Sequence, residues 1–393
     1  MSNLLSPIES IPITAGAAST QQATKVILVR HARTTYNQQG RYQGSSDTSV
    51  LTEQGQLDAY TTGLALQQFD FDALYTSPLT RVQQTTSAII SAWNQKIPPV
   101  IVEPRLTEVC MSDWQGLYYH EVKEHFAEAY SCWQNTPQLF SRDGVFFPVL
   151  ELFNQAQSFW RSLLARHRSQ TILVVAHGGT NRALIATAIG LSPSHYHSLQ
   201  QSNCGITCLT FKAGTAGHHQ PKLNYLNVTN HLDEKLPKLK AGKTGWRWLL
   251  LSNSTAQDLL HRSYLPELMA QNKIDLVLTD NSQRGENLAH NLATAHQQTV
   301  HFAISQERFL ETWQQRISQR QRANSAVGSA SLTTGLIIAG DHLLQPIFSK
   351  TLAVDPVVNL AGYLSVIHYP HANCQSILQG VIPLEQQFIS QLS

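Results

Sequence analysis

The chain of 393 residues lacks several features that would assign it to a special class of protein. Its formal net charge is only +2, and no lysine- or arginine-rich run is present, so nucleic acid is not expected as a partner. Its five cysteines form no CxxC pair and no even framework, which indicates reduced thiols and a reducing compartment. No uninterrupted apolar run approaches the roughly 20 residues that span a bilayer, so no membrane partner is expected.

The start of the chain also lacks the charged residues and apolar core of a signal peptide. Residues 1–23 are rich in serine, threonine, alanine and proline and contain no lysine or arginine. We therefore expect a disordered tail there and a cytoplasmic protein. Neither an HExxH motif nor a DxDxDG loop occurs, so no metal and no other cofactor is expected.

The length and composition predict a globular protein of two domains. The chain is longer than a usual single domain, and a hydrophobic content of 42% supplies ample core. Residues 233–245 are rich in lysine and contain Pro237 and two glycines, which is typical of an exposed linker. We expect one domain over residues 24–232 and a second over residues 246–393.

Two histidines follow short apolar-rich runs and are the most informative residues. His31 follows residues 26–30 and His177 follows residues 172–176, and both runs read as buried parallel strands of an α/β fold. The carboxyl ends of such strands form the ligand crevice of an open sheet. Any one histidine taken singly is more often a structural residue, but two of them at strand ends predict one shared site.

The neighbours of these histidines suit a phosphate group. Arg30 and Arg33 flank the first histidine, and Gly178 follows the second where a helix begins. Arginine grips phosphate oxygens with a fork of donors, and a helix N-terminus supplies free N–H groups and a positive dipole end. The sequence therefore predicts a phosphate-binding site.

Further polar residues follow other predicted strands or lie in loops between them. Asn37 and Gly44 lie in a polar loop that could frame a pocket, and Arg81 falls in the first turn of a helix that follows a strand. Glu108 comes after a third apolar stretch, residues 100–102. A glutamate among arginines is normally a salt-bridge partner.

Four blocks in this order resemble the histidine phosphatase superfamily, the phosphoglycerate-mutase-like group. They are Arg30-His31-Ala32-Arg33, Ser77-Pro78-Leu79-Thr80-Arg81, Leu106-Thr107-Glu108 and Ala176-His177-Gly178. The resemblance covers roughly residues 24–232 and implies a three-layer α/β/α domain with a mostly parallel sheet and a helical cap over about residues 112–165.

The resemblance also implies roles for individual residues. His31 would accept the phosphoryl group, Glu108 would be the general acid, and His177 would complete the catalytic set. The implied phosphate and substrate ligands are Arg30, Asn37, Gly44, Arg81 and Gly178.

The implied activity is that of a metal-independent phosphomonoesterase that acts through a phosphohistidine on a small phosphorylated metabolite. Ala32 stands where the family has glycine, and a backbone with positive φ there would be strained by its methyl group. Arg33 is an added cation, which either suits a substrate carrying both phosphate and carboxylate or is simply solvated. The long loop of true mutases after the glutamate is missing, which favours a hydrolase. A phosphoglycerate mutase and a non-catalytic phosphometabolite-binding or scaffold protein stay open as alternatives.

The second half repeats the first, but the two strand-end histidines are replaced. Arg284 precedes Glu311 by 27 positions, the same interval that separates Arg81 from Glu108. Asn253 and Gly340 then stand in the places of the two histidines. We expect a second phosphoglycerate-mutase-like domain, a degenerate repeat that is catalytically inactive and serves as structural support. An intact copy followed by a degraded one is similar to the 2-carboxy-D-arabinitol-1-phosphatase-like subgroup of plants and cyanobacteria, whose substrates are phosphorylated sugar acids.

Overall fold

The computed structural model describes residues 23–141, 143–213, 219–255, 264–293, 299–326, 331–355, 358–370 and 375–385. The tail expected over residues 1–23 lies outside these ranges except for its last residue. Within the described ranges, no helix has the length and apolarity that crossing a membrane requires.

Twelve strands in this part of the chain form one mixed sheet with the order β3-β2-β4-β1-β5-β6-β12-β11-β7-β10-β8-β9. The first half contributes β1 (Thr24–Arg30), β2 (Ala73–Thr76), β3 (Val100–Val102), β4 (Thr171–Ala176), β5 (Ile206–Ala213) and β6 (His219–Val228). The second half contributes β7 (Gly245–Ser252), β8 (Leu276–Thr279), β9 (Val300–Ala303), β10 (Leu332–Ala339), β11 (Tyr363–Tyr369) and β12 (Ile377–Pro383).

Both halves have the same strand order when each is followed inward from its outer edge. Each begins with four parallel strands, which are followed by an antiparallel strand, β5 or β11. The halves meet where β6 and β12 pair antiparallel, with Leu226 opposite Val381. This pairing joins two sheet edges that would otherwise expose unpaired backbone groups.

Helices cover both faces of the first half-sheet, which explains why its strands are apolar throughout. Val26 and Leu28 of β1 face the core under α6 (Pro148–Arg166) and α7 (Gly178–Ile189). Ile27 and Val29 alternate with them and face α2 (Glu53–Leu66) and α3 (Thr80–Ser91). A strand buried on both faces needs apolar side chains at every position. The expected α/β fold is therefore confirmed.

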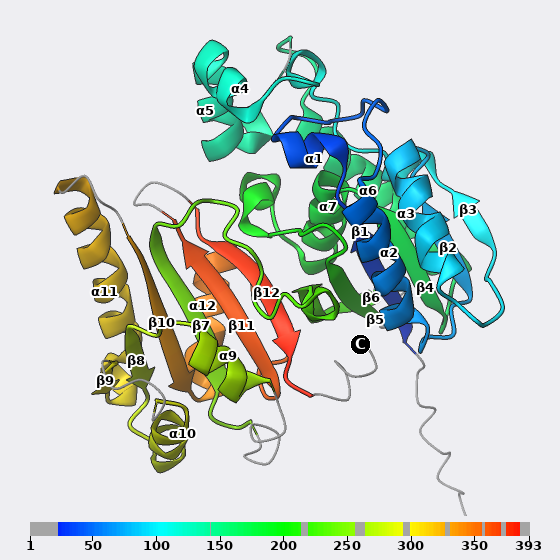
Figure 1. Ribbon diagram of the computed structural model, residues 1–393. Helices are drawn as coiled ribbons and strands as arrows, with labels where there is room; N and C mark the ends of the chain where they lie inside the picture. The colour runs from blue at the N-terminus through cyan, green and yellow to red at the C-terminus, as the bar shows by residue number, and fades with distance from the viewer. Residues whose placement is uncertain are drawn as a thin grey trace, which may run out of the picture.

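The second half-sheet is covered in the same way. One face packs against α9 (Leu265–Gln271) and α10 (Gln283–Ala293). The other packs against α11 (Gln306–Ala326) and α12 (Asp341–Leu352). Figure 1 shows the two halves side by side, with the green to red half joined to the blue to green half through the strands at the centre.

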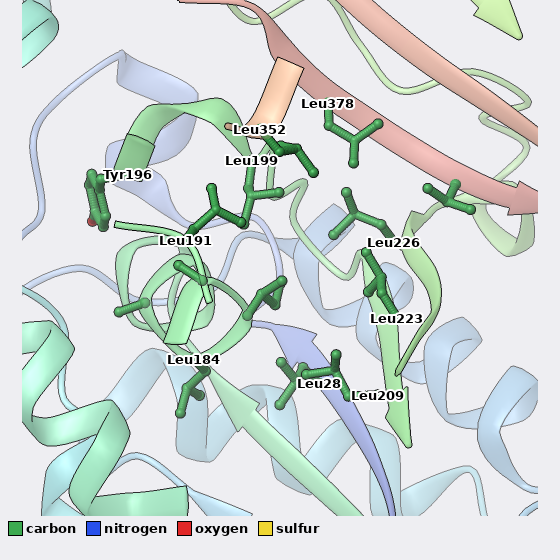
Figure 2. Packing of buried hydrophobic residues seen from close by; sticks show 14 of the residues in the cluster. Leu28, Leu184, Leu191, Tyr196, Leu199, Leu209, Leu223, Leu226, Leu352 and Leu378 are labelled. Carbon is green, nitrogen blue, oxygen red and sulfur yellow. The ribbon is translucent and has the colours of Figure 1, made fainter. Parts of the chain in front are cut away.

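One hydrophobic cluster runs through both halves of the molecule. Figure 2 shows Leu352 and Leu378 of the second half beside Leu199 and Leu226 of the first. Gln200 N–H also donates to the Leu378 carbonyl at 3.0 Å across this junction. The shared core indicates that the halves stabilise each other.

The segment expected as a helical cap divides into two parts. The short helices α4 (Tyr119–His125) and α5 (Ala127–Asn135) lie beside α1 (Thr35–Gln39) at the top of Figure 1. By contrast α6 packs along α7, and Trp160 Nε1 donates to the Leu184 carbonyl at 2.9 Å. The cap thus consists of the segment before α6, whereas α6 belongs to the helical layer.

Candidate active site

The two histidines lie side by side because β1 and β4 are neighbouring parallel strands. Arg30 pairs with Ala176 at the ends of these strands, and His31 N–H donates to the Ala176 carbonyl at 2.9 Å. The ring centroids of His31 and His177 are 5.4 Å apart, with the rings edge to face. The strand-end positions in the sequence predicted this meeting.

His31 is held as a neutral ring with one free nitrogen. Its Nδ1 lies 2.9 Å from the Ala32 carbonyl, which can only accept a hydrogen bond, so Nδ1 carries the hydrogen. Burial lowers the pKa of His31 well below 6.5, and the charges of Arg30 and Arg81 lower it further. The unprotonated Nε2 is therefore the nitrogen available to attack an electrophile.

His177 is the N-cap residue of α7, and its Nδ1 can donate a hydrogen bond to an anion. Its Nε2 lies 2.8 Å from Ser77 Oγ, which also accepts from Leu79 N–H. This arrangement favours donation from the Ser77 hydroxyl to Nε2 and a hydrogen on Nδ1. Nδ1 is buried and has no hydrogen-bond partner among the described residues. Burial lowers the pKa of His177 well below 6.5, and the charge of Arg81 lowers it further.

Two arginines complete the cationic wall of the site. The Arg81 guanidinium is fully buried and donates to the Ser46 and Gly44 carbonyls, each at 2.7 Å. Arg30 donates to the Gln201 carbonyl at 2.9 Å. Burial lowers the pKa of Arg81 to about 10. Gly44 thus holds Arg81 through its carbonyl and adopts a positive φ of 53°, which favours glycine.

The site contains buried donors without a partner in the described structure. They are Arg30 Nε, Arg81 Nε and His177 Nδ1. A buried donor left unpaired costs about 1–3 kcal/mol, so three of them at one site indicate a place for an anionic ligand. Gly178 lies beside this place, since a Cβ there would be 3.1 Å from Arg30 Nε.

Glu108 lies at the N-terminus of α7, just after His177. Its carboxylate accepts from Gly179 N–H at 2.9 Å, Thr180 N–H at 3.1 Å and Val109 N–H at 3.0 Å. A Cβ on Gly179 would lie 2.3 Å from Glu108 Oε1 and 2.4 Å from the Tyr196 hydroxyl. Gly179 therefore makes room for this carboxylate. The sequence offered a signal for this role, because Gly179 is the second of two glycines that follow His177.

Asn37 reaches the site through a residue that the sequence analysis missed. Asn203 Nδ2 donates to Asn37 Oδ1 at 3.0 Å and to the carbonyls of His31 at 3.0 Å and Ala32 at 3.2 Å. Asn203 thereby fixes the loop that carries the first histidine. It lies 172 positions away in the sequence, so no local pattern reveals the contact.

The two departures from the family pattern have different outcomes. Ala32 has no positive φ, is fully buried and donates its N–H to Thr85 Oγ1 at 3.0 Å, so its methyl group causes no backbone strain. The side chain of Arg33 is exposed. Arg33 is therefore not one of the buried cations of the site, and that part of the expectation finds no support in the structure.

Comparison with known proteins agrees with this geometry. The model of the histidine phosphatase superfamily (branch 1) matches residues 26–222. The chain belongs to this superfamily. The resemblance seen in the sequence is thereby confirmed, and the match covers the half that carries both histidines.

Three relatives of this superfamily member illustrate the range of similar proteins. It is 43% identical over 212 residues to a probable 2-carboxy-D-arabinitol-1-phosphatase of Arabidopsis thaliana and 41% identical over 209 residues to the 2-carboxy-D-arabinitol-1-phosphatase of Triticum aestivum. These alignments use 53% of this chain but only 43% and 41% of the plant proteins, so the chain spans less than half of their length. Phosphoserine phosphatase 1 of Hydrogenobacter thermophilus is 31% identical over 213 residues, and the alignment covers 53% of this chain and 95% of that protein.

The corresponding place in the second half of this chain holds a carboxylate of its own. Asn253 N–H donates to the Ala339 carbonyl at 2.9 Å, as His31 does to Ala176. Asp280 follows β8 and accepts from Gly340 N–H at 2.9 Å and from Asn253 Nδ2 at 2.8 Å. The Asp280 carboxylate thus satisfies donors at the two positions that correspond to His31 and His177. The ring of His342 lies next to Gly340, since a Cβ on Gly340 would be 2.8 Å from His342 Nδ1.

Proposed function

We propose that this protein is a metal-independent phosphomonoesterase that transfers the phosphoryl group of a small phosphorylated metabolite to His31 and then to water. The observation that carries the proposal is the neutral imidazole whose Nδ1 is fixed by the Ala32 carbonyl, next to three buried donors without partners. Arg30 and Arg81 supply the positive charge that phosphoryl transfer needs around the equatorial oxygens.

In the first step, His31 Nε2 attacks phosphorus and the bond from phosphorus to the ester oxygen breaks. Glu108 in its acid form gives its proton to the leaving alkoxide, so an alcohol departs and a phosphohistidine remains. A positioned general acid of this kind contributes about 10²–10⁴-fold to the rate. Its place at the start of α7, next to the second histidine, is suitable for this role.

In the second step, the Glu108 carboxylate takes a proton from water as the water oxygen attacks phosphorus. The bond from phosphorus to His31 Nε2 breaks, inorganic phosphate is released and the neutral imidazole is restored. His177 and the two arginines hold the phosphate oxygens in both steps. The roles of Asn37, Gly44 and Gly178 in this scheme are to support the loop, Arg81 and the phosphate, respectively.

The substrate class follows from the relatives and from the charge of the site. The named relatives act on a phosphorylated sugar acid and on phosphoserine, both of which carry a carboxylate. We propose a small phosphorylated acid as substrate, a degenerate and inactive second half, and a cytoplasmic location. A phosphoglycerate mutase would need the phosphohistidine to return its phosphoryl group to the same substrate skeleton.

The test is hydrolysis of p-nitrophenyl phosphate by the purified protein in excess chelator. His31→Ala should abolish turnover, whereas the matched change Asn253→Ala at the equivalent place in the second half should leave it unchanged. Turnover that depends on added metal, or that survives His31→Ala, would refute the proposal. Activity found only with a bisphosphorylated primer would favour the mutase.

A further inference from the structure

The segment that joins the two halves is anchored close to the site, although its composition predicted an exposed linker. Arg247 Nη2 of β7 donates to the Pro237 carbonyl at 2.6 Å. Gln200 Nε2 donates to the Lys238 carbonyl at 3.0 Å, and Gln200 Oε1 accepts from Gln379 Nε2 at 3.1 Å. Groups from both halves therefore fix residues 237–238 and determine where the chain leads next.

The next lysine, Lys240, reaches the cationic wall of the site. Its ammonium donates to the Gln201 carbonyl, the same oxygen that accepts from Arg30 Nη1 at 2.9 Å. Because a hydrogen bond spans about 3 Å, two donors on one oxygen lie within roughly 6 Å of each other. Lys240 as a whole is an exposed residue, so a ligand can reach it from solvent. A residue outside the matched family region thus contributes a positive charge next to Arg30.

A third cation adds to this cluster. Arg182 of α7 donates Nε to the Leu199 carbonyl at 2.8 Å, and its charge acts on both Arg30 and Lys240. The burial of the ammonium and the charges of these two arginines lower the pKa of Lys240 well below 10.5. Glu234 opposes the effect, but its carboxylate is already paired with Lys238. The fold therefore holds these cations close together against their mutual repulsion.

We propose that Lys240 binds the carboxylate of a phosphorylated acid whose phosphate lies on Arg30, Arg81 and His177. This inference rests on the proposed function and names the residue that selects the substrate. Arg30 and Arg81 suffice for a phosphate dianion, so Lys240 and Arg182 are surplus unless the substrate carries a second acidic group. A bound carboxylate would relieve the repulsion among the cations.

The proposal also assigns a use to the second half, which has Asn253 and Gly340 in place of the two site histidines. Arg247 and Gln379 belong to β7 and β12, and they anchor the segment that directs Lys240 toward the site. The second half thus positions a specificity residue without taking part in the chemistry. Lys240 takes the role of the extra cation that the sequence suggested for Arg33, because its ammonium donates to the carbonyl oxygen that Arg30 also uses.

The test compares two ligands that differ in one group. 3-Phosphoglycerate carries a carboxylate where glycerol 3-phosphate carries a hydroxymethyl group. Calorimetric titration of the His31→Ala protein measures the binding of both without turnover. Lys240→Met removes the charge and keeps the stem, Lys240→Arg keeps the charge, and Lys238→Met is the matched control on an exposed lysine of the same segment.

We expect the His31→Ala protein to prefer 3-phosphoglycerate. Lys240→Met should weaken its binding roughly 10- to 100-fold, the contribution of a charge-assisted hydrogen bond, and should change glycerol 3-phosphate binding by less than about threefold. Lys240→Arg should keep most of the preference, and Lys238→Met all of it. Equal affinity for the two ligands, binding of neither, or an equal loss for both with Lys240→Met would overturn the proposal.

Turnover separates this inference from the proposed function. If the protein binds 3-phosphoglycerate through Lys240 but hydrolyses no phosphate ester, the phosphatase proposal fails and the binding site stands. If the wild-type protein hydrolyses both esters and Lys240→Met leaves the ratio of their kcat/KM values unchanged, the phosphatase proposal stands and Lys240 is not the selecting residue.

Discussion

Gly179→Ala should displace Glu108, the proposed general acid, while leaving His31, the proposed nucleophile, intact. The new methyl group would lie 2.3 Å from Glu108 Oε1 and 2.4 Å from the Tyr196 hydroxyl, so the carboxylate must leave the N-terminus of α7. It would then lose its bonds from Gly179 N–H at 2.9 Å and Thr180 N–H at 3.1 Å. Crowding costs about 1–3 kcal/mol of stability, and the higher helix propensity of alanine returns about 1 kcal/mol.

The effect on catalysis should depend on the leaving group. An alkoxide needs protonation as it departs, so the first-turnover rate with an alkyl phosphate should fall by about 10²-fold or more. p-Nitrophenolate departs readily without a proton, so its first-turnover release should be much less affected. Rapid-quench measurement of the first turnover isolates this step from hydrolysis of the phosphohistidine.

Making Gly179→Ala in a Glu108→Ala protein tests whether its effect on the first turnover acts through Glu108. In a Glu108→Ala protein, Gly179→Ala should slow the first turnover by no more than about threefold further, because the group that it displaces is gone. An equal loss on both substrates, or a full additional loss in the Glu108→Ala background, would refute the assignment of Gly179 as the residue that makes room for the acid.

Three other outcomes are expected. The pKa values of His31 and His177 are lowered in the folded protein, so the unfolded chain binds more protons below about pH 6.5. The free energy of unfolding should therefore decrease as the pH falls below that value. Urea titrations at several pH values should show a smaller decrease when both histidines are replaced by asparagine. Asp280→Ala should lower the free energy of unfolding by about 1–3 kcal/mol, because Asn253 Nδ2 and Gly340 N–H lose their acceptor. Turnover by the first half should persist, and unchanged stability would contradict this role of Asp280. Leu378→Ala should destabilise the whole molecule by about 2–5 kcal/mol with one unfolding transition, and two separate transitions in calorimetry would show that the halves do not share a core.

Much of the catalytic half could be predicted because its signals are local. A short apolar run indicates a buried strand, and the residue directly after it lies at the end of that strand. His31 and His177 were identified in this way. Arg81 and Glu108 follow other strands of the same sheet, so parallel topology brings them to the same edge. The roles proposed for these residues remain predictions.

The remaining features depend on contacts that no local pattern records. The Ala32 carbonyl that fixes the His31 tautomer, the Asn203 amide that supports the loop and the space at Gly179 are set by side-chain direction and close packing. Lys240 looked like one more solvated lysine in a basic segment, yet its partner carbonyl on Gln201 lies 39 positions earlier in the chain.

The sequence by itself determined the α/β class, the family and the order of strands and helices, because periodicity and motifs act within short windows of the chain. Only the tertiary structure decided that β6 and β12 join the halves into one sheet, that a carboxylate fills the second site and that the connecting segment reaches the first. The reason is physical. These features depend on where distant segments meet, and that is fixed by the packing of one shared core and the pairing of two sheet edges.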